Sequence, residues 1–434
     1  MRAALARAAY STLLWLLQPA FFVRLWWRGR REPLYRFAWH ERLGFTRATA
    51  VPGRVWIHAV SLGETRAAQT LVDALRRERP GLRLLLTQGT ATGREAGRAL
   101  LRPGDAQAWL PLDTPAAVRR FLRQQRPALG VLMETEIWPN LLVAAARASV
   151  PMVLANARLS ERSLAKGRRL RWLLQPALAA LRCTLAQTEA DAARLRAAGV
   201  AAVQVAGNLK FDLEPDAALQ AQGRQWRSAL ARPVVLLASS REGEEAMLLS
   251  AWATLPAPPP LLLIVPRHPQ RFDEVHALAA AALPRVLRRS ALKSTPPRDA
   301  GLVDAWIGDS LGEMPLYYAL ADVALLGGSF ASLGGQNLIE AAACGCPVLL
   351  GPHTFNFAAA ADDAITAGAA LRVADLAAGV AQARALTGTA EGVARRAAMA
   401  AQGEAFARAH RGAAARMAGA ISALLPDDTS PPAS

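Results

Sequence analysis

The sequence predicts an α/β protein built from two doubly wound domains. From Val55 onward, short apolar runs alternate with longer amphipathic segments, the pattern of parallel strands joined by crossover helices. The chain has 434 residues, of which 52% are apolar. Because one hydrophobic core rarely supports so long a chain, we expect two domains of roughly 200 residues each.

Each short apolar run is a candidate strand, because a strand buried on both faces needs no polar alternation. The candidates in the first half are 55–60, 82–87, 129–133, 152–155, 184–186 and 203–206, and those in the second half are 234–238, 261–265, 303–307, 323–326 and 348–350. Acidic residues and Pro215 interrupt the pattern at 212–216. We therefore expect an N-terminal helix over 1–32, domains over 33–212 and 213–425, and a polar tail over 426–434.

The N-terminal helix carries an uncharged, aromatic-rich stretch between Arg7 and Arg24. This stretch is shorter than the roughly 20 residues of a spanning helix and contains Gln18 and Pro19. Bulky aromatics stand where signal cleavage needs small residues, which argues against a removed signal peptide. The composition favours a helix at the membrane interface or a marginal signal anchor. The alternative is a first helix docked on the domain.

The net charge restricts the possible partners of the protein, and its cysteine content restricts the compartment in which it works. The chain has 51 Lys and Arg against 34 Asp and Glu, a net charge of +17, which predicts an anionic partner such as nucleic acid, acidic lipid or a phosphorylated substrate. The three cysteines, Cys183, Cys344 and Cys346, lie in apolar segments. They indicate a reducing compartment and serve as small packing residues, and we expect no metal site.

Segment 322–352 is the clearest ligand signal, because it has the pattern of a strand, a glycine-rich turn, a helix and a strand. Glycines let backbone amides approach an anion, and a helix start adds its positive dipole end. Asn337 and Glu340 are three residues apart, so both face one crevice, where a carboxylate can accept hydrogen bonds from a ribose diol. The alternative is a helix cap with an exposed carboxylate.

The motif S-x-x-E follows a predicted strand in each half, with Ser61 and Glu64 in the first and Ser310 and Glu313 in the second. This motif is a capping box, in which the two side chains satisfy free amides at a helix start. Ligands of open parallel sheets bind at the carboxyl ends of strands, where both glutamates lie. Each glutamate can therefore cap a helix and contact a ligand.

Six motifs in register along the chain resemble one family, the 3-deoxy-D-manno-octulosonic acid (Kdo) transferases of lipopolysaccharide assembly. They are HAVSLGET at 58–65, METEIWPN at 133–140, ANARLS at 155–160, GNLKFD at 207–212, PRHP at 266–269 and GPHTFNF at 351–357. Three positions differ from the usual family residues: His40 replaces glycine, while Arg241 and Gln336 replace histidines. Glutamine does not change charge near neutral pH, which puts a titrating role at position 336 in doubt.

The resemblance implies a two-Rossmann-domain (GT-B) glycosyltransferase with a cleft between its domains. Such an enzyme transfers Kdo from CMP-Kdo to the 6′ hydroxyl of lipid IVA, a lipid A precursor, with inversion at the anomeric carbon. By likeness, Glu64 is the general base, and Glu134 and Lys210 stabilise the transition state. The residues implied to hold CMP are Arg267, His268, Leu311, Gly312, Glu313, Asn337, Leu338, Ile339 and Glu340. No metal or other cofactor is implied, and the location is the cytoplasmic face of the inner membrane.

Structural roles remain open for the implied residues. Lys210 could pair with Asp212 on the surface, Arg267 and His268 could cap a helix, and one of Glu134 and Glu136 could be structural. The CMP leaving group carries less charge than a sugar diphosphate. Cationic side chains and a helix start can therefore balance the charge of CMP without a divalent ion.

Three alternative functions use the same features. A GT-B enzyme with a UDP-sugar donor, or a 2-epimerase, would share the fold and the ribose glutamate. A non-enzymatic membrane scaffold conflicts with the many polar residues at strand ends. A nucleic-acid-binding protein conflicts with scattered arginines and the lack of a recognised motif, so we expect no nucleic-acid partner.

Overall fold

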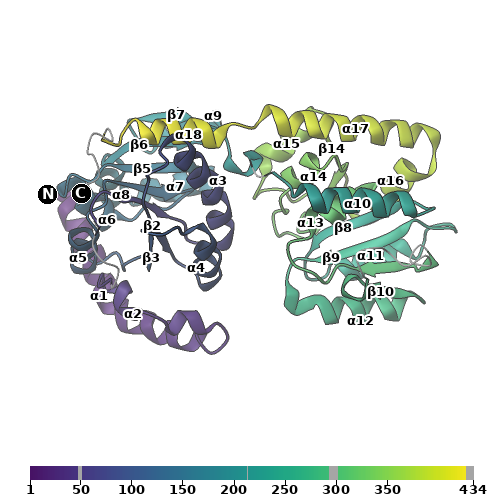
Figure 1. Ribbon diagram of the computed structural model, residues 1–434, viewed down its shortest axis with the longest axis horizontal. Helices are drawn as coiled ribbons and strands as arrows, with labels where there is room; N and C mark the ends of the chain where they lie inside the picture. The colour runs from purple at the N-terminus through teal and green to yellow at the C-terminus, as the bar shows by residue number, and fades with distance from the viewer. Residues whose placement is uncertain (47–50, 213, 293–301, 427–434) are drawn as a thin grey trace. The chain divides into compact units, whose positions relative to one another are not determined.

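The computed structural model describes residues 1–46, 51–212, 214–292 and 302–426. The chain forms two compact units, each with its own parallel sheet (Figure 1). The first unit contains residues up to Asp212 together with the C-terminal segment from Arg411, and the second ends at His410.

The sheet of the first unit has seven parallel strands in the order β3-β2-β1-β4-β5-β6-β7. Their bounds are β1 Val55–His58, β2 Leu84–Gln88, β3 Ala106–Trp109, β4 Leu129–Met133, β5 Met152–Ala157, β6 Leu181–Ala186 and β7 Val203–Val205. The strand order reverses between β1 and β4. Ligands of doubly wound sheets bind at such a reversal, beyond the carboxyl ends of the strands.

Helices cover both faces of this sheet. They are α1 Arg2–Arg28, α2 Trp39–Arg42, α3 Leu62–Glu78, α4 Ala91–Gly97, α5 Pro115–Gln125, α6 Pro139–Arg147, α7 Glu161–Arg169, α8 Arg171–Leu178, α9 Glu189–Ala197 and α18 Ala413–Ser422. One buried apolar cluster joins the strands to α3 and α18, and another joins them to α5, α6, α8 and α9. The sheet is therefore buried on both sides, which is why its central strands are continuous apolar runs.

The second unit repeats this architecture. Its parallel strands lie in the order β10-β11-β9-β8-β12-β13-β14. The strands are β8 Val234–Ser240, β9 Leu261–Pro266, β10 Val286–Arg288, β11 Ala305–Ile307, β12 Val323–Leu326, β13 Val348–Leu350 and β14 Ala370–Arg372, and the helices are α10 Ala217–Ala229, α11 Glu244–Trp252, α12 Phe272–Ala282, α13 Met314–Leu320, α14 Ile339–Ala343, α15 Ala358–Thr366, α16 Leu376–Gly388 and α17 Ala390–Ala409. The strand order reverses between β8 and β12.

The expected end of the second domain at residue 425 is wrong. Helix α18 packs against α3 of the first unit, and Figure 1 shows it in yellow beside that helix. The carboxylate of Asp212 accepts hydrogen bonds from the backbone N–H groups of Gly412 and Ala414. Asp212 thus anchors the returning chain at the start of α18. Of the predicted polar tail, 427–434 lie outside the described residues.

The N-terminal segment forms the expected helix, α1. It packs on α6 and α8 of the first unit, and many of its large apolar side chains are exposed. None of the helices in the described part of the chain is both long enough and apolar enough to cross a membrane. The structure therefore does not confirm a spanning anchor.

Candidate active site

Glu64 and Glu134 follow the two strands that flank the reversal in the first sheet. Glu64 lies in the first turn of α3, after β1, and Glu134 follows β4 directly. The predicted capping box at Ser61 is confirmed. The hydroxyl of Ser61 accepts a hydrogen bond from the Glu64 backbone N–H at 3.3 Å. The Glu64 carboxylate accepts hydrogen bonds from Val60 N–H at 2.8 Å and from the Ser61 hydroxyl at 3.1 Å.

The backbone at Glu134 is held in the left-handed region, with φ of 57°. This conformation is costly for a residue with a Cβ, and such strain is concentrated at functional sites. Backbone hydrogen bonds maintain it: Glu134 N–H donates to the Ala155 carbonyl at 2.9 Å, and the Glu134 carbonyl accepts from Arg158 N–H at 3.4 Å. The buried Glu134 carboxylate also pairs with Arg158 Nε at 3.1 Å. Both the backbone and the carboxylate of Glu134 are therefore held in place.

Lys210 is brought to the same edge of the sheet by a buried asparagine. Asn156 has φ of 53° and is fully buried. Its Oδ1 accepts a hydrogen bond from Leu209 N–H at 3.1 Å, and Asn208 Oδ1 accepts one from Lys210 N–H at 3.0 Å. The charges that act on the lysine come from Glu134, Arg158 and Glu64. Asp212, the surface partner considered for Lys210, instead accepts hydrogen bonds from backbone N–H groups at the start of α18.

Burial and mutual charge shift the pKa values of these groups. Burial raises the pKa of Glu64, and the negative charge of Glu134 raises it further. For Glu136, burial followed by the charge of Glu64 raises the pKa to about 7. Burial lowers the pKa of Lys210, although the two nearby carboxylates oppose this. Glu64, Glu134, Glu136, Arg158 and Lys210 form the candidate active site of the first unit, which we call the catalytic cluster. Perturbed pKa values of this kind are typical of functional sites.

A cavity of about 540 Å³ opens beside the catalytic cluster. Glu134 and Arg158 line it on one side. Most of the remaining wall is apolar, with leucines from β5, α7, α8 and α9: Leu154, Leu164, Leu174, Leu178 and Leu195. The cavity can therefore accommodate hydrocarbon next to ionised groups.

In the second unit, cationic groups gather at the ends of β8 and β9. Arg267 follows β9, and its backbone N–H donates to the Ser240 carbonyl at 3.0 Å. Partial burial lowers the pKa of His268, and the positive charges of Arg241 and Arg267 lower it further. His268 makes no side-chain cap on the short 3-10 turn that follows, so the capping alternative is wrong for His268. The positive charges of Arg241 and Arg267 favour the binding of an anion at this edge of the sheet.

Glu313 does not form the predicted capping box. Helix α13 begins only at Met314, after Glu313. The carboxylate accepts hydrogen bonds from Arg289 Nη2 at 2.8 Å and from the Ser310 hydroxyl. Leu311 and Gly312 precede it in the loop after β11, with Leu311 exposed and Gly312 at φ of 82°. Glu313 thus fixes this loop through side chains of its own unit.

The glycine-rich loop after β12 is organised by a buried carboxylate that the sequence did not reveal. Glu244, fully buried at the start of α11, accepts hydrogen bonds from the N–H groups of Gly328 at 2.8 Å, Phe330 at 3.2 Å and Ala331 at 3.1 Å. The expectation that these amides close on a ligand is wrong, because Glu244 occupies them. Gln336, in the same loop, donates its backbone N–H to the Gly327 carbonyl at 3.1 Å.

Residues 337–340 stand at the start of α14, as expected. Asn337 Oδ1 accepts a hydrogen bond at 3.1 Å from the N–H of Ile339, the first residue of α14, whose N-cap position is Leu338. Leu338 and Ile339 are buried, whereas Glu340 is half-buried. Because α14 has only five residues, its dipole is weak. Glu340, rather than the helix start, is the strongest polar feature of this segment.

The structure brings Glu64, Glu134 and Lys210 together in the first unit. In the second unit, the implied CMP residues follow β9, β11 and β12, whose carboxyl ends share one edge of the sheet. Sequence reasoning gave no role to Arg158 or Asn156, although both lie in the ANARLS motif. The signal for Asn156 was its residue type, since asparagine tolerates the left-handed region.

Comparisons with known proteins decide the family. The family model for 3-Deoxy-D-manno-octulosonic-acid transferase (kdotransferase) matches residues 38–213. The chain is 50% identical over 386 residues to the 3-deoxy-D-manno-octulosonic acid transferase of Bordetella pertussis, which covers 86% of this chain and 89% of that protein. The chain belongs to the Kdo transferase family. The Kdo transferase of Haemophilus influenzae is 34% identical over 359 residues, covering 81% of this chain and 83% of that protein.

Solved structures support the fold of this Kdo transferase. A glycosyltransferase from Rickettsia africae ESF-5 matches with a TM-score of 0.57 at 11% identity, covering 86% of this chain and 98% of its own. Anabaena Alr3699/HepE in complex with UDP matches with a TM-score of 0.57 at 15% identity, covering 85% and 100%. The two parallel-sheet units thus resemble GT-B glycosyltransferases. With the family established, this Kdo transferase is a glycosyltransferase of lipopolysaccharide biosynthesis.

Proposed function

We propose that this Kdo transferase moves Kdo from CMP-Kdo to the 6′ hydroxyl of lipid IVA, with inversion at the anomeric carbon and with Glu64 as general base. One observation supports the base assignment above the others. Glu64 lies at the reversal of the first sheet, with its pKa raised by burial and by the charge of Glu134. A raised pKa makes the ionised carboxylate a stronger proton acceptor at neutral pH.

In the proposed step, the Glu64 carboxylate takes the proton of the acceptor hydroxyl as its oxygen bonds to the anomeric carbon of Kdo. The bond between that carbon and the phosphate oxygen breaks, and CMP leaves with the electron pair. The capping contacts do not prevent this role. Each carboxylate oxygen accepts one hydrogen bond and keeps a lone pair for the incoming hydroxyl.

Glu134 and Lys210 are proposed to stabilise the transition state. Direct displacement develops positive charge at the sugar and negative charge on the leaving phosphate. A fixed carboxylate favours the first, and a lysine favours the second. Arg158 holds Glu134 through its 3.1 Å ion pair, which makes it a positioning residue.

The donor is proposed to bind at the edge of the second sheet. Arg267 and His268 would contact the phosphate. Arg241, whose positive charge acts on His268, would contact it as well. Leu311, Gly312 and Glu313 would contact the nucleotide from the loop after β11. Residues 337–340 would hold it from α14, with the Glu340 carboxylate accepting hydrogen bonds from the ribose diol. Transfer without a bound metal remains a prediction.

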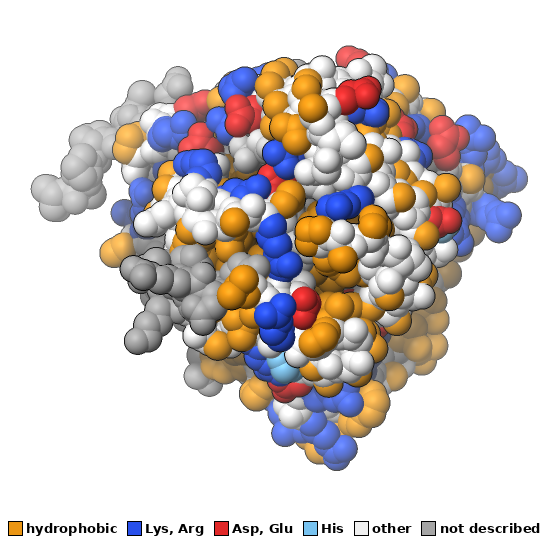
Figure 2. Space-filling view, turned by 90° about the vertical axis from the view of Figure 1, so that its right-hand side faces the viewer, with side chains coloured by type: hydrophobic (Ala, Val, Ile, Leu, Met, Phe, Trp, Pro, Cys, Tyr) orange, Lys and Arg blue, Asp and Glu red, His pale blue; other side chains and the backbone are white. Residues whose placement is uncertain are grey.

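The acceptor and the membrane location are proposed from the first unit. The 540 Å³ cavity places an apolar wall beside Glu134, which suits a sugar acceptor that carries acyl chains. Helix α1 exposes Trp15, Trp26 and Trp27, and aromatic side chains favour the headgroup region of a bilayer. The face in Figure 2 is the right-hand side of Figure 1, where the second unit is drawn; blue Lys and Arg side chains lie among orange apolar ones there, and this face does not bear on α1. We propose that the protein acts at the cytoplasmic face of the inner membrane, without a nucleic-acid partner.

Mass spectrometry of the lipid product tests this function. The purified protein is incubated with lipid IVA and freshly generated CMP-Kdo, and parallel reactions contain UDP-hexoses. The proposal predicts an added Kdo mass only with CMP-Kdo. An added hexose mass, or no product with any donor, would contradict it.

A further inference from the structure

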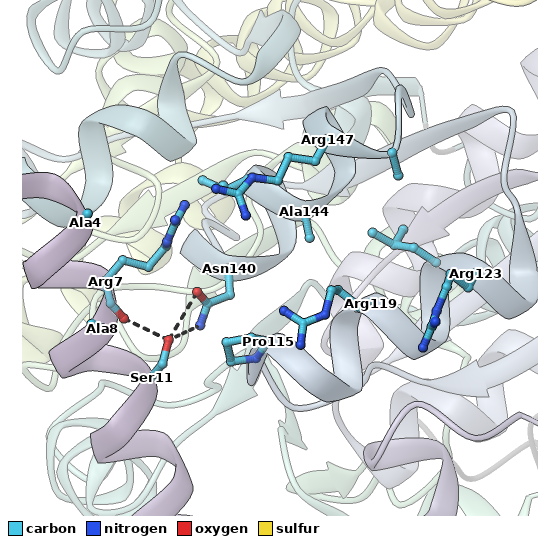
Figure 3. Close-up of a pocket in the computed structure, with 13 residues that line it drawn as sticks. Ala4, Arg7, Ala8, Ser11, Pro115, Arg119, Arg123, Asn140, Ala144 and Arg147 are labelled. Atoms are coloured by element: carbon cyan, nitrogen blue, oxygen red, sulfur yellow. Dashed lines mark hydrogen bonds between the residues drawn. The ribbon is translucent and has the colours of Figure 1, made fainter.

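A second cavity of the first unit, apart from the catalytic cluster, is surrounded by arginines. It measures about 530 Å³ and lies among α1, α5 and α6. Figure 3 shows Arg7 from α1, Arg119 and Arg123 from α5, and Arg147 from α6 around it. No acidic side chain is among the described residues that line this cavity, which we call the arginine pocket.

The four guanidinium groups are available to a ligand. Within the described ranges, none of the four has an ion pair or a side-chain hydrogen bond to another residue. Arg119, Arg123 and Arg147 are exposed, and Arg7 is half-exposed. Like charges around one cavity repel each other and focus a positive potential into it, which an anion relieves. Guanidinium groups also match the oxygens of a phosphate in paired hydrogen bonds.

A nearby carboxylate is held by hydrogen bonds and does not line the pocket. Asp113 is buried and accepts hydrogen bonds from Tyr10 OH at 3.0 Å, Asn140 N–H at 3.0 Å and Leu141 N–H at 2.8 Å. The same contacts attach α1 to the unit. Ser11 and Asn140 add a side-chain hydrogen bond at 3.0 Å on the floor of the pocket (Figure 3). These contacts therefore hold in place the helices that form the arginine pocket.

The surroundings of the pocket indicate a lipid rather than a soluble anion. Ala4, Arg7, Ala8 and Ser11 recur at helical spacing, so one face of α1 forms a wall. Trp15 is one turn beyond Ser11 on this face and is 54% exposed. Leu5 and Leu16, eleven residues apart and so on one stripe, are 62% and 73% exposed. Apolar and aromatic side chains beside a basic pocket are the arrangement that meets a bilayer surface.

We propose that the arginine pocket binds the phosphate of an acidic glycerophospholipid and so holds α1 and the first unit on the membrane. The phosphate would sit among the four guanidinium groups, while the exposed side chains of α1 enter the headgroup region. This site is separate from the residues assigned to Kdo transfer, and its occupancy does not depend on the donor or on the base. It adds a specific lipid contact to the general attraction of a +17 chain.

Vesicle flotation tests the proposal on the full chain. The vesicles contain phosphatidylcholine alone or phosphatidylcholine with about 30% phosphatidylglycerol, enough to give the surface a negative potential. We expect the double variant Arg119→Gln with Arg123→Gln to bind the acidic vesicles about thirty-fold more weakly. This factor is the combined contribution of two basic residues near an anionic surface. Both side chains are exposed, so the melting temperature should not change. Arg147→Gln alone should give a smaller loss.

The matched control removes the same charge elsewhere. Arg77 and Arg395 are also exposed, and Arg77→Gln with Arg395→Gln should leave vesicle binding within about two-fold, because distant surface charges are screened. Equal losses in the two double variants would overturn the pocket in favour of net charge, and no loss in the pocket variant would also overturn it. Inorganic phosphate distinguishes a soluble ligand. If phosphate raises the melting temperature of the wild type but not of the pocket variant, while both bind vesicles equally, the lipid assignment fails.

Discussion

Ser61→Ala is the perturbation that separates the positioning of Glu64 from ordinary helix stability. In the wild type, the hydroxyl of Ser61 accepts a hydrogen bond from Glu64 N–H and donates one to Glu64 Oε1 at 3.1 Å. The substitution removes both. Only the contact from Val60 N–H then holds the carboxylate.

The size of the effect follows from these two contacts. Loss of a serine N-cap costs about 1 kcal/mol of helix or domain stability, which lowers the melting temperature of a domain of this size by about 2 to 4 °C. A loosened carboxylate in the proposed mechanism should reduce kcat for Kdo transfer roughly ten- to a hundred-fold. CMP binding should not change, because Ser61 is not among the residues assigned to the nucleotide.

The pH dependence of transfer should change in a defined direction. Burial raises the pKa of Glu64, and the Ser61 hydroxyl partly offsets that rise by stabilising the ionised carboxylate. Without the hydroxyl, the folded-state pKa is higher still. Since the base acts when ionised, activity is lost as pH falls through that pKa, so the acidic limb of kcat should move to higher pH. Ser61→Thr, which keeps a hydroxyl, should restore most of the rate and the limb.

A matched control exists in the same unit. Ser160 is the N-cap of α7 and accepts a hydrogen bond from Ser163 N–H at 3.1 Å. The helix that it caps carries no residue of the catalytic cluster. Ser160→Ala should cost about the same 1 kcal/mol and leave Kdo transfer and its pH profile unchanged. The reasoning is refuted if the two variants lose activity equally, or if Ser61→Ala keeps the wild-type rate and profile.

Three further substitutions test the remaining assignments. Lys210→Met should lower kcat about 100- to 1,000-fold, the range for one lost transition-state contact, with CMP affinity kept; an unchanged kcat in steady-state kinetics would refute its role. Glu340→Gln should weaken CMP binding about ten- to a hundred-fold in calorimetry, because hydrogen bonds to a charged group contribute about 1.5 to 3 kcal/mol, and the exposed Glu391→Gln serves as control. Glu134→Gln removes a negative charge that adds to the effect of burial on the Glu64 pKa, so the acidic limb should move to lower pH; no movement would contradict the coupling.

The sequence predicted the central strands of both sheets and missed three of the four edge strands. All eleven candidate strands exist, with modest differences at their ends. The missed strands β3, β10 and β14 are edge strands. Edge strands have one paired side and need no continuous apolar run, so Val286–Arg288, partly exposed throughout, resembles a loop in sequence. Helix α18 packs on the first unit through a long-range contact with Asp212 that no local pattern indicates.

In the candidate site, the sequence indicated contacts between neighbouring residues but not contacts between distant segments. The capping box at Ser61 and Glu64 was visible because its four residues are adjacent in sequence. The second S-x-x-E motif gave the wrong local structure, because Arg289 binds Glu313 at 2.8 Å and the helix begins later. The contacts of Glu244 with the loop after β12, and of Asn156 with Leu209, join segments more than 50 residues apart. Such pairs depend on how the strands assemble, which residue patterns alone do not specify.

The role of Glu64 as general base is tested most directly by the rate of Kdo transfer by Glu64→Gln, measured beside CMP binding on the same preparation. Glutamine keeps the size and the hydrogen-bonding oxygen of the side chain but cannot accept the proton. Because a general base contributes about 100- to 10,000-fold to the rate, we expect a loss of that size with wild-type CMP affinity and melting temperature. A variant that transfers Kdo at the wild-type rate would contradict the assignment of Glu64 as the base.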